Sequence, residues 1–259
     1  MAGMTSSQAP QILAVANQKG GVAKTTTVAS LGAALAEQGQ RVLLVDLDPQ
    51  ACLTFSLGID PEDLELSVHH VLTKGLDPRE VIIETDDGVD LLPATIELAR
   101  AEADLLTRTG REYVIRTAVE ETDGYDWVLL DCPPSLGVLT VAALTAATRV
   151  LIPLQCETLS HRGVGQLLDT VHDVKRFTNR ELEVWGVLPT LYDGRTNHAR
   201  TVLETISETY ELDVIEPPIP KSIRFAEAPA AGRSILKTSR SNKGAQAYRD
   251  VATGLLERV

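Results

Sequence analysis

The sequence of 259 residues contains few cysteines and few aromatic residues. Its three cysteines, Cys52, Cys132 and Cys156, are widely spaced and odd in number, which favours reduced thiols over a disulfide framework or a zinc site. Aromatic residues make up 4% of the chain, so aliphatic side chains must fill the core, as they do in layered α/β folds. No apolar run approaches the roughly 18 residues of a membrane span, and residues 1–10 lack the basic and apolar regions of a signal peptide. We therefore expect a cytoplasmic protein with a flexible tail at 1–10 and a single domain at 11–259.

An excess of positive charge is also missing, since the net charge is −12, but the charges are unevenly distributed. Residues 57–126 contain 18 acidic and 6 basic side chains. Residues 217–249 contain 7 Lys or Arg residues and one acidic residue, Glu227. The basic segment 217–249 is therefore not apparent from the net charge of the whole chain. A local cluster of positive charge of this kind is expected at a site that binds a polyanion.

A lysine- and glycine-containing stretch lies between an apolar run, Ile12–Val15, and a helical pattern that begins near Thr25. A turn of this kind presents backbone N–H groups and a helix N-terminus to phosphate oxygens. The candidate phosphate-binding residues are Lys19, Gly20, Gly21, Val22, Ala23, Lys24, Thr25 and Thr26. Lys24 is expected to reach the β- and γ-phosphates, and the Thr25 hydroxyl to hold Mg²⁺. The usual glycine positions carry Gln18 and Ala23 instead.

Lys19 is an additional lysine ahead of the paired glycines. Two lysines on one phosphate group repel each other, so Lys19 is expected to contact the nucleotide of a facing subunit instead. An arginine finger acts across an interface in the same way. This position predicts a composite site and a dimer.

Strands alternate with helices along most of the chain, which predicts a doubly wound, mostly parallel α/β sheet with helices on both faces. Strands are expected at 12–16, 41–45, 89–93, 127–131, 150–153, 184–191 and near 214. Helices are expected at 25–38, 68–72, near 81, and at 96–108, 111–121, 138–147, 160–177, 197–210 and 244–258. The rest of 57–88 is expected to be irregular, and the proline-rich segment 217–243 a loop.

Acidic residues end two of the expected buried strands. Because the carboxyl ends of parallel strands share one edge of a sheet, Asp46, Asp48 and Asp131 should meet the phosphate loop there. Asp131 is expected beside Mg²⁺, through a water, and Asp48 is expected to orient the attacking water in phosphoryl transfer.

Five ordered stretches together resemble the ParA/Soj family of partitioning ATPases over roughly residues 11–258. Lys19 to Thr26 is similar to the family's deviant Walker A motif, with its lysine before the paired glycines. The others are Val45 to Gln50, Asp131 to Ser135, Leu191 to Thr196, and Ile219 to Pro229, of which the first two resemble switch I and the Walker B and switch II region.

The resemblance implies ATP and Mg²⁺ as ligands, an ATP-dependent homodimer joined through Lys19, and slow hydrolysis stimulated by a ParB-like activator. It implies that Thr190 and Pro220 border the adenine. It also implies that Arg195 and Arg224 hold backbone phosphates of non-specific double-stranded DNA, with Lys221 and Arg240 as helpers. The expected role is chromosome or plasmid partitioning at the nucleoid, with the acidic stretch 57–126 receiving the activator.

The chain departs from the family pattern at two places. The family usually has glycine where Ala23 stands, and a methyl group there costs roughly 1 kcal/mol or more if φ is positive. Ala51 and Cys52 replace the Gly-Asn pair that often follows switch I. These departures concern nucleotide affinity and hydrolysis rate rather than the fold.

Other functions fit the sequence less well. An orphan ParA- or MinD-type ATPase could position another cargo or act at a membrane, but the apolar stripe of the last expected helix is more simply core-facing. An iron–sulfur carrier needs more cysteine than Cys132 alone provides, and no Asn-Lys-x-Asp motif for guanine is present. A ligase of the dethiobiotin-synthetase type would need a substrate pocket that no motif identifies. The histidines, His69, His70, His161, His172 and His198, show no metal-ligand spacing.

Overall fold

The computed structural model of the chain describes residues 9–157, 160–195 and 197–258. Most of the expected tail at 1–10, as well as Thr196, lies outside these residues. The strands are β1 Gln11–Val15, β2 Val42–Asp46, β3 Ile83–Glu84, β4 Asp90–Leu92, β5 Trp127–Asp131, β6 Arg149–Gln155 and β7 Glu183–Thr190. The helices are α1 Lys24–Glu37, α2 Cys52–Ser56, α3 Val68–Lys74, α4 Leu98–Leu106, α5 Val114–Glu120, α6 Val138–Ala146, α7 Ser160–Phe177, α8 Asn197–Tyr210, α9 Arg224–Glu227, α10 Ile235–Thr238 and α11 Lys243–Leu256. Short 3-10 turns are η1 Pro61–Asp63, η2 Pro78–Glu80, η3 Arg111–Tyr113 and η4 Pro229–Ala231.

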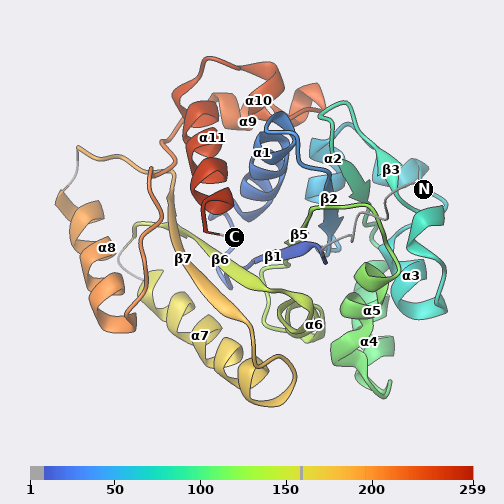
Figure 1. Ribbon diagram of the computed structural model, residues 1–259. Coiled ribbons are helices and arrows are strands. Elements are labelled where there is room, and N and C mark those ends of the chain that lie inside the picture. Colours follow the sequence, from blue (N-terminus) through green and yellow to red (C-terminus); the bar gives the residue numbers. More distant parts are fainter. Residues whose placement is uncertain (1–8, 158–159, 196, 259) are drawn as a thin grey trace, which may run out of the picture.

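The strands form one seven-stranded sheet in the order β3-β4-β2-β5-β1-β6-β7 (Figure 1). Every pairing is parallel except that of β3 with β4. This confirms the predicted doubly wound, mostly parallel α/β fold. Because β5 lies between β1 and β2, the ends of these three strands are neighbours.

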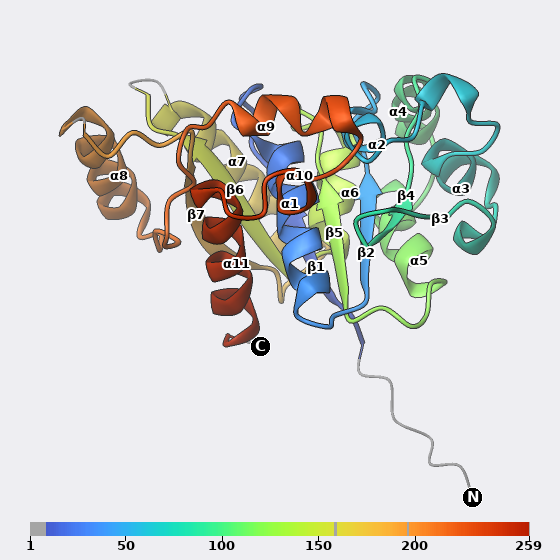
Figure 2. The same ribbon diagram turned by 90° about the horizontal axis from the view of Figure 1, so that it is seen from above.

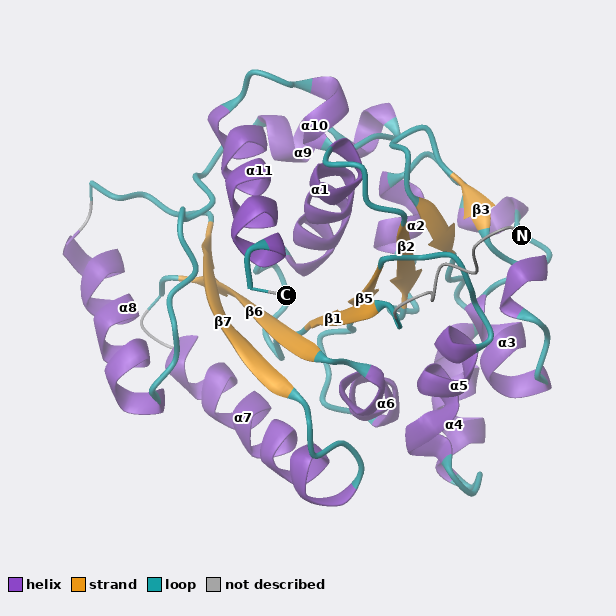
Figure 3. Ribbon diagram, in the orientation of Figure 1, coloured by secondary structure: helices purple, strands orange, loops and turns teal. Residues whose placement is uncertain are grey.

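Helices cover both faces of the sheet (Figure 3). Leu13 and Val15 of β1 pack in one core with α1, α10 and α11, whereas Ala14 packs in the other core with helices α3 to α7. Alternate residues of a strand point to opposite faces, so a continuous apolar run supplies both cores. The apolar stripe of α11, including Tyr248, Val251 and Leu255, is buried as expected.

Three expectations about secondary structure were wrong. The segment 217–243 is not a continuous loop, because it contains α9, η4 and α10. The acidic region, whose residues outside the short helices were expected to be irregular, contains a strand, β3. In addition, α2 follows β2 in a segment for which no element was predicted. Elements of two to five residues are too short to show a period in the sequence. The strand expected near residue 214 is a single bridge between Val187 and Val214.

No helix in the part of the chain that the structure describes is both long and apolar enough to cross a membrane.

Candidate functional site

The predicted phosphate loop joins β1 to α1. Gly21 has φ +75°, and a Cβ atom added at Gly20 or Gly21 would meet no heavy atom within 4 Å. Ala23, directly before α1, has φ 65° and ψ 33°, the left-handed conformation that favours glycine. The two glycines therefore face open space, and the positive φ that was expected to strain the backbone at Ala23 is present.

Two buried side chains fix this loop to neighbouring strands. Asn17 donates its amide to the carbonyl of Pro153 at 2.8 Å and accepts the Lys19 N–H at 3.0 Å. The Thr190 hydroxyl, at the end of β7, donates to the carbonyl of Val22 at 2.9 Å. Thr190 is fully buried, so its side chain is a brace for the phosphate loop.

Lys24 is the buried lysine of the loop, with 7% of its surface exposed. Its ammonium donates to the carbonyl of Lys19 at 3.3 Å, so the side chain lies back along the loop. Burial lowers the pKa of Lys24, and the negative charge of Asp131 opposes this shift most strongly. The negative charge of a phosphate in the loop would stabilise the charged form of Lys24 and so oppose the effect of burial.

Asp131 ends β5 between Val15 of β1 and Asp46 of β2. It is 1% exposed, and among the residues that the structure describes no group meets the geometry of a hydrogen bond to either carboxylate oxygen, although the Thr25 hydroxyl lies close enough to act on its pKa. Burial and then the charge of Asp46 raise its pKa, while the hydroxyl of Thr25 and the ammonium of Lys24 oppose the shift. A buried carboxylate whose oxygens have this spare hydrogen-bonding capacity suits a cation or its water shell.

Within the described residues, no group of three or more His, Cys, Asp or Glu side chains could hold a metal by itself. Mg²⁺ commonly takes only one or two protein ligands and completes its shell with water and phosphate oxygens. Thr25 and Asp131 fit that kind of site.

Asp46 was not given a role from the sequence, but it organises the neighbouring segment. It is fully buried and accepts the Thr54 N–H at 2.9 Å and the Thr54 hydroxyl at 2.7 Å. Burial raises its pKa to about 6. Thr54 lies in α2, so Asp46 fixes that helix to the end of β2. The acidic residue at the strand end was visible in the sequence, but its partner was not.

Asp48 remains closer to the surface and is half-buried. Its carboxylate accepts the Gln50 N–H at 2.9 Å, and its charge acts on Lys24. The structure therefore brings the predicted residues Lys24, Asp48 and Asp131 together at one edge of the sheet. Ala51, at the start of α2, has φ 51° and ψ 33° and is a second alanine in the left-handed conformation.

Lys19 forms an ion pair with Glu157, just beyond the end of β6. No spacing in the sequence indicates this partner, since the pair depends on β6 lying beside β1. Thr26 lies in the first turn of α1 and lines a small hollow with Ser56 and Phe225.

The candidate DNA-binding residues lie on three segments that touch one another. The Lys221 N–H donates to the carbonyl of Tyr192 at 3.3 Å, which joins the Arg195 loop to the segment before α9, and Tyr192 and Pro220 form a bridge. Asn242 donates its amide to the Ser222 hydroxyl at 3.4 Å, which brings in the segment after Arg240. Figure 2 shows α9 near α2 at one edge of the fold.

Acidic neighbours reduce the free charge of this surface. Arg195 is 90% exposed and forms two hydrogen bonds of 2.9 Å with Asp193, whose pKa this pairing lowers to about 2. Arg224 pairs with Glu227 at 2.7 Å. By contrast, Lys221, Arg240 and Lys243 form no salt bridge with any other residue that the structure describes.

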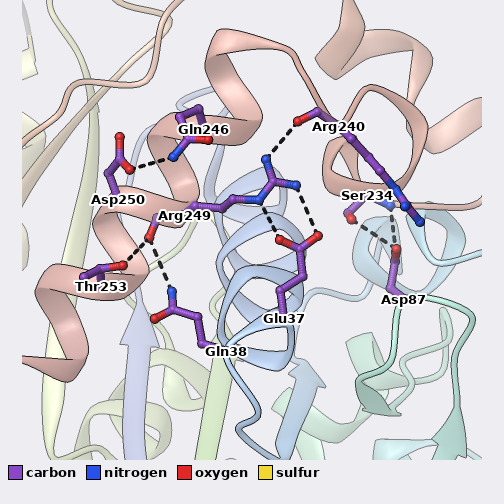
Figure 4. Close-up of polar contacts among 9 residues, drawn as sticks. All are labelled: Glu37, Gln38, Asp87, Ser234, Arg240, Gln246, Arg249, Asp250 and Thr253. Atoms are coloured by element: carbon purple, nitrogen blue, oxygen red, sulfur yellow. Dashed lines mark hydrogen bonds and ion pairs between the residues drawn. The ribbon is translucent and has the colours of Figure 1, made fainter.

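Two anchors hold the α10 segment against the fold (Figure 4). Asp87 is 2% exposed and accepts the Ser234 N–H at 2.7 Å and the Ser234 hydroxyl at 3.1 Å. Arg249 forms an ion pair with Glu37 at 2.6 Å and donates to the carbonyl of Arg240 at 2.8 Å. Arg249 is therefore a structural residue of the basic segment.

Comparisons with known proteins agree with this architecture. A family model described as an AAA domain matches residues 10–184. The chain is 43% identical to the sporulation initiation inhibitor protein Soj of Bacillus subtilis over 244 residues, covering 93% of this chain and 96% of Soj. It is 39% identical to the chromosome partitioning protein ParA of Caulobacter vibrioides over 252 residues, covering 96% and 94%. A crystal structure described as cobyrinic acid a,c-diamide synthase from Mycobacterium smegmatis with bound ADP and magnesium is 56% identical, with a TM-score of 0.87 and coverage of 96% and 95%.

Proposed function

The chain belongs to the ParA/Soj family of P-loop ATPases, and we propose that it is an ATP-dependent switch that binds non-specific DNA as a dimer. In this proposal it hydrolyses ATP to ADP and phosphate in chromosome or plasmid partitioning at the nucleoid. A ParB-like protein stimulates the reaction.

The phosphate loop carries the proposal. Gly20, Gly21 and the α1 N-terminus offer backbone N–H groups, and Lys24 supplies the buried positive charge. Mg²⁺, held by Thr25 and through water by Asp131, would neutralise charge on the β- and γ-phosphates. Asp48 lies near Lys24 and would accept a hydrogen bond from the attacking water. The single observation that best supports this chemistry is that both buried carboxylate oxygens of Asp131 lack a hydrogen bond of full geometry within the part of the chain that the structure describes.

Dimerisation would place Lys19 against the nucleotide of the facing subunit. The two subunits would then present two copies of the surface made by Arg195, Lys221, Arg224 and Arg240. Because these side chains would bind phosphates, affinity should fall steeply with salt and depend little on sequence.

The experiment is DNA binding with ATP, ADP or no nucleotide at two salt concentrations. We expect tight binding only with ATP. Replacing both Arg195 and Arg224 by alanine should weaken DNA binding. It should also reduce the slope of log affinity against log salt concentration by about one for each phosphate that is no longer bound. Arg79→Ala is the matched control, because Arg79 pairs with Asp77 two residues away as Arg195 pairs with Asp193. Full DNA binding by the double variant would refute the proposed surface.

Hydrolysis is tested separately with Asp48→Ala. The variant lacks the acid that is proposed to orient the attacking water. It should therefore bind ATP without hydrolysing it and stay dimeric. Turnover at the wild-type rate would exclude that role for Asp48.

A second candidate function comes from the M. smegmatis structure, which is described as a cobyrinic acid a,c-diamide synthase with bound ADP and magnesium. The test supplies cobyrinic acid, ATP and an ammonia source and follows the mass of the product. We expect none, and formation of the diamide would replace the switch proposal. Sedimentation with liposomes and ATP, without DNA, similarly tests a role at a membrane.

A further inference from the structure

The ion pair between Lys19 and Glu157 joins residues 138 positions apart in the sequence. The backbone of Lys19 is held on both sides. Its N–H donates to Asn17 at 3.0 Å, and its carbonyl accepts the Lys24 ammonium at 3.3 Å. The direction of the Lys19 side chain is therefore the remaining freedom at this position, and in the structure its ammonium pairs with Glu157.

Electrostatics within the subunit favour this direction. The ammonium of Lys24 already occupies the phosphate loop, and burial lowers its pKa. A second ammonium in the same place would destabilise the charged form of Lys24 further. Glu157 keeps the charge of Lys19 outside the loop that Lys24 serves.

The Lys19 side chain lies at an open face of the molecule. Its side chain is 37% exposed, and that of Glu157 is 52% exposed. A hollow of about 510 Å³ adjoins Lys19 and is lined also by Pro134 and Arg162. The ammonium can thus be reached by a group from outside the subunit.

We propose that Glu157 is a positioning residue that holds Lys19 out of its own phosphate loop and ready for the nucleotide of a facing subunit. This inference rests on the proposed function, because it takes Lys19 to act across a dimer interface. An exposed ion pair changes an equilibrium constant by about 1.4-fold to fivefold. A symmetric dimer contains two such pairs, so loss of Glu157 should weaken dimerisation about twofold to thirtyfold.

The test measures the dimer dissociation constant by analytical ultracentrifugation with a non-hydrolysable ATP analogue and Mg²⁺. Glu157→Gln should weaken the dimer, and Glu157→Asp, which keeps the charge, should recover part of the loss. In a Lys19→Ala background, Glu157→Gln should have no further effect. Glu183→Gln is the matched control, because it removes one carboxylate from the Glu183–Arg149 pair at the opposite end of β6.

The outcomes separate the two proposals. If Lys19→Ala weakens the dimer but Glu157→Gln leaves it unchanged or tightens it, the positioning role is refuted and the proposed function stands. A further loss from Glu157→Gln in the Lys19→Ala background also refutes positioning, since Glu157 would then act elsewhere. If Lys19→Ala dimerises like the wild type, the role of Lys19 across the interface fails, and the role of Glu157 fails with it.

Discussion

Replacing Ala23 by glycine should stabilise the protein, although glycine in the interior of a helix usually destabilises it. At φ 65° and ψ 33°, an alanine costs about 1–2 kcal/mol relative to its right-handed conformation. Glycine removes that cost but gives the unfolded chain about 0.4–1 kcal/mol of extra conformational freedom. Ala23 is half-buried, so removing its methyl group loses about 0.4 kcal/mol of hydrophobic stabilisation.

The net expectation is a gain of about 0.5 kcal/mol in the free energy of unfolding, or roughly 1–2 °C in Tm for a chain of this size. Ala51 has a similar conformation but is 2% exposed. Its methyl group contributes about 0.8 kcal/mol through burial, so Ala51→Gly should be close to neutral.

The assay is urea and thermal unfolding without nucleotide. Ala103→Gly is the control, because Ala103 is exposed within α4 and should lose about 1 kcal/mol in the usual way. A loss for Ala23→Gly equal to that of Ala103→Gly would refute the reasoning, since it would mean that position 23 carries no strain that glycine relieves.

Two further predictions concern close packing and buried charge. Asp131→Asn should stabilise the nucleotide-free protein by about 1–3 kcal/mol while abolishing the rise in Tm given by Mg²⁺ and ADP. The pKa of Asp131 is raised in the folded protein, so its charged form destabilises the fold at pH values above the unfolded pKa. The stability gained by Asp131→Asn should therefore shrink as the pH falls through the raised pKa. A gain in stability that does not change with pH would contradict this. Gly232→Ala should lower the free energy of unfolding in urea by about 1–3 kcal/mol more than Gly75→Ala does. Both glycines have a positive φ, but of the two only Gly232 has backbone close to an added Cβ atom, with the Gly58 Cα at 2.8 Å. Equal losses would show that this packing relaxes freely.

The sequence predicted the centre of the sheet better than its surroundings. β2 and β5 are continuous apolar runs, and burial on both faces of a parallel sheet requires that pattern. By contrast, α9 and α10 have four residues each, which is too few to show a helical period.

The candidate site divides in the same way. Lys24 and Asp131 could be placed because a loop after one strand and an acid after another must meet at the carboxyl edge. The roles of Asp46 and Glu157 could not be predicted, because each depends on a partner brought close by the tertiary structure, Thr54 in one case and Lys19 in the other.

The bracing of the phosphate loop has a consequence for how the protein matures during synthesis. The loop is encoded near the N-terminus, but its supports are Pro153 and Thr190, and Thr27 of α1 shares a hydrogen bond of 2.9 Å with Tyr248 near the C-terminus. A ribosome-bound chain that ends before residue 190 contains the whole of the phosphate loop without the brace from Thr190. Nucleotide binding should therefore arise late in translation, when the C-terminal third has emerged and docked, and truncated chains should not compete for ATP.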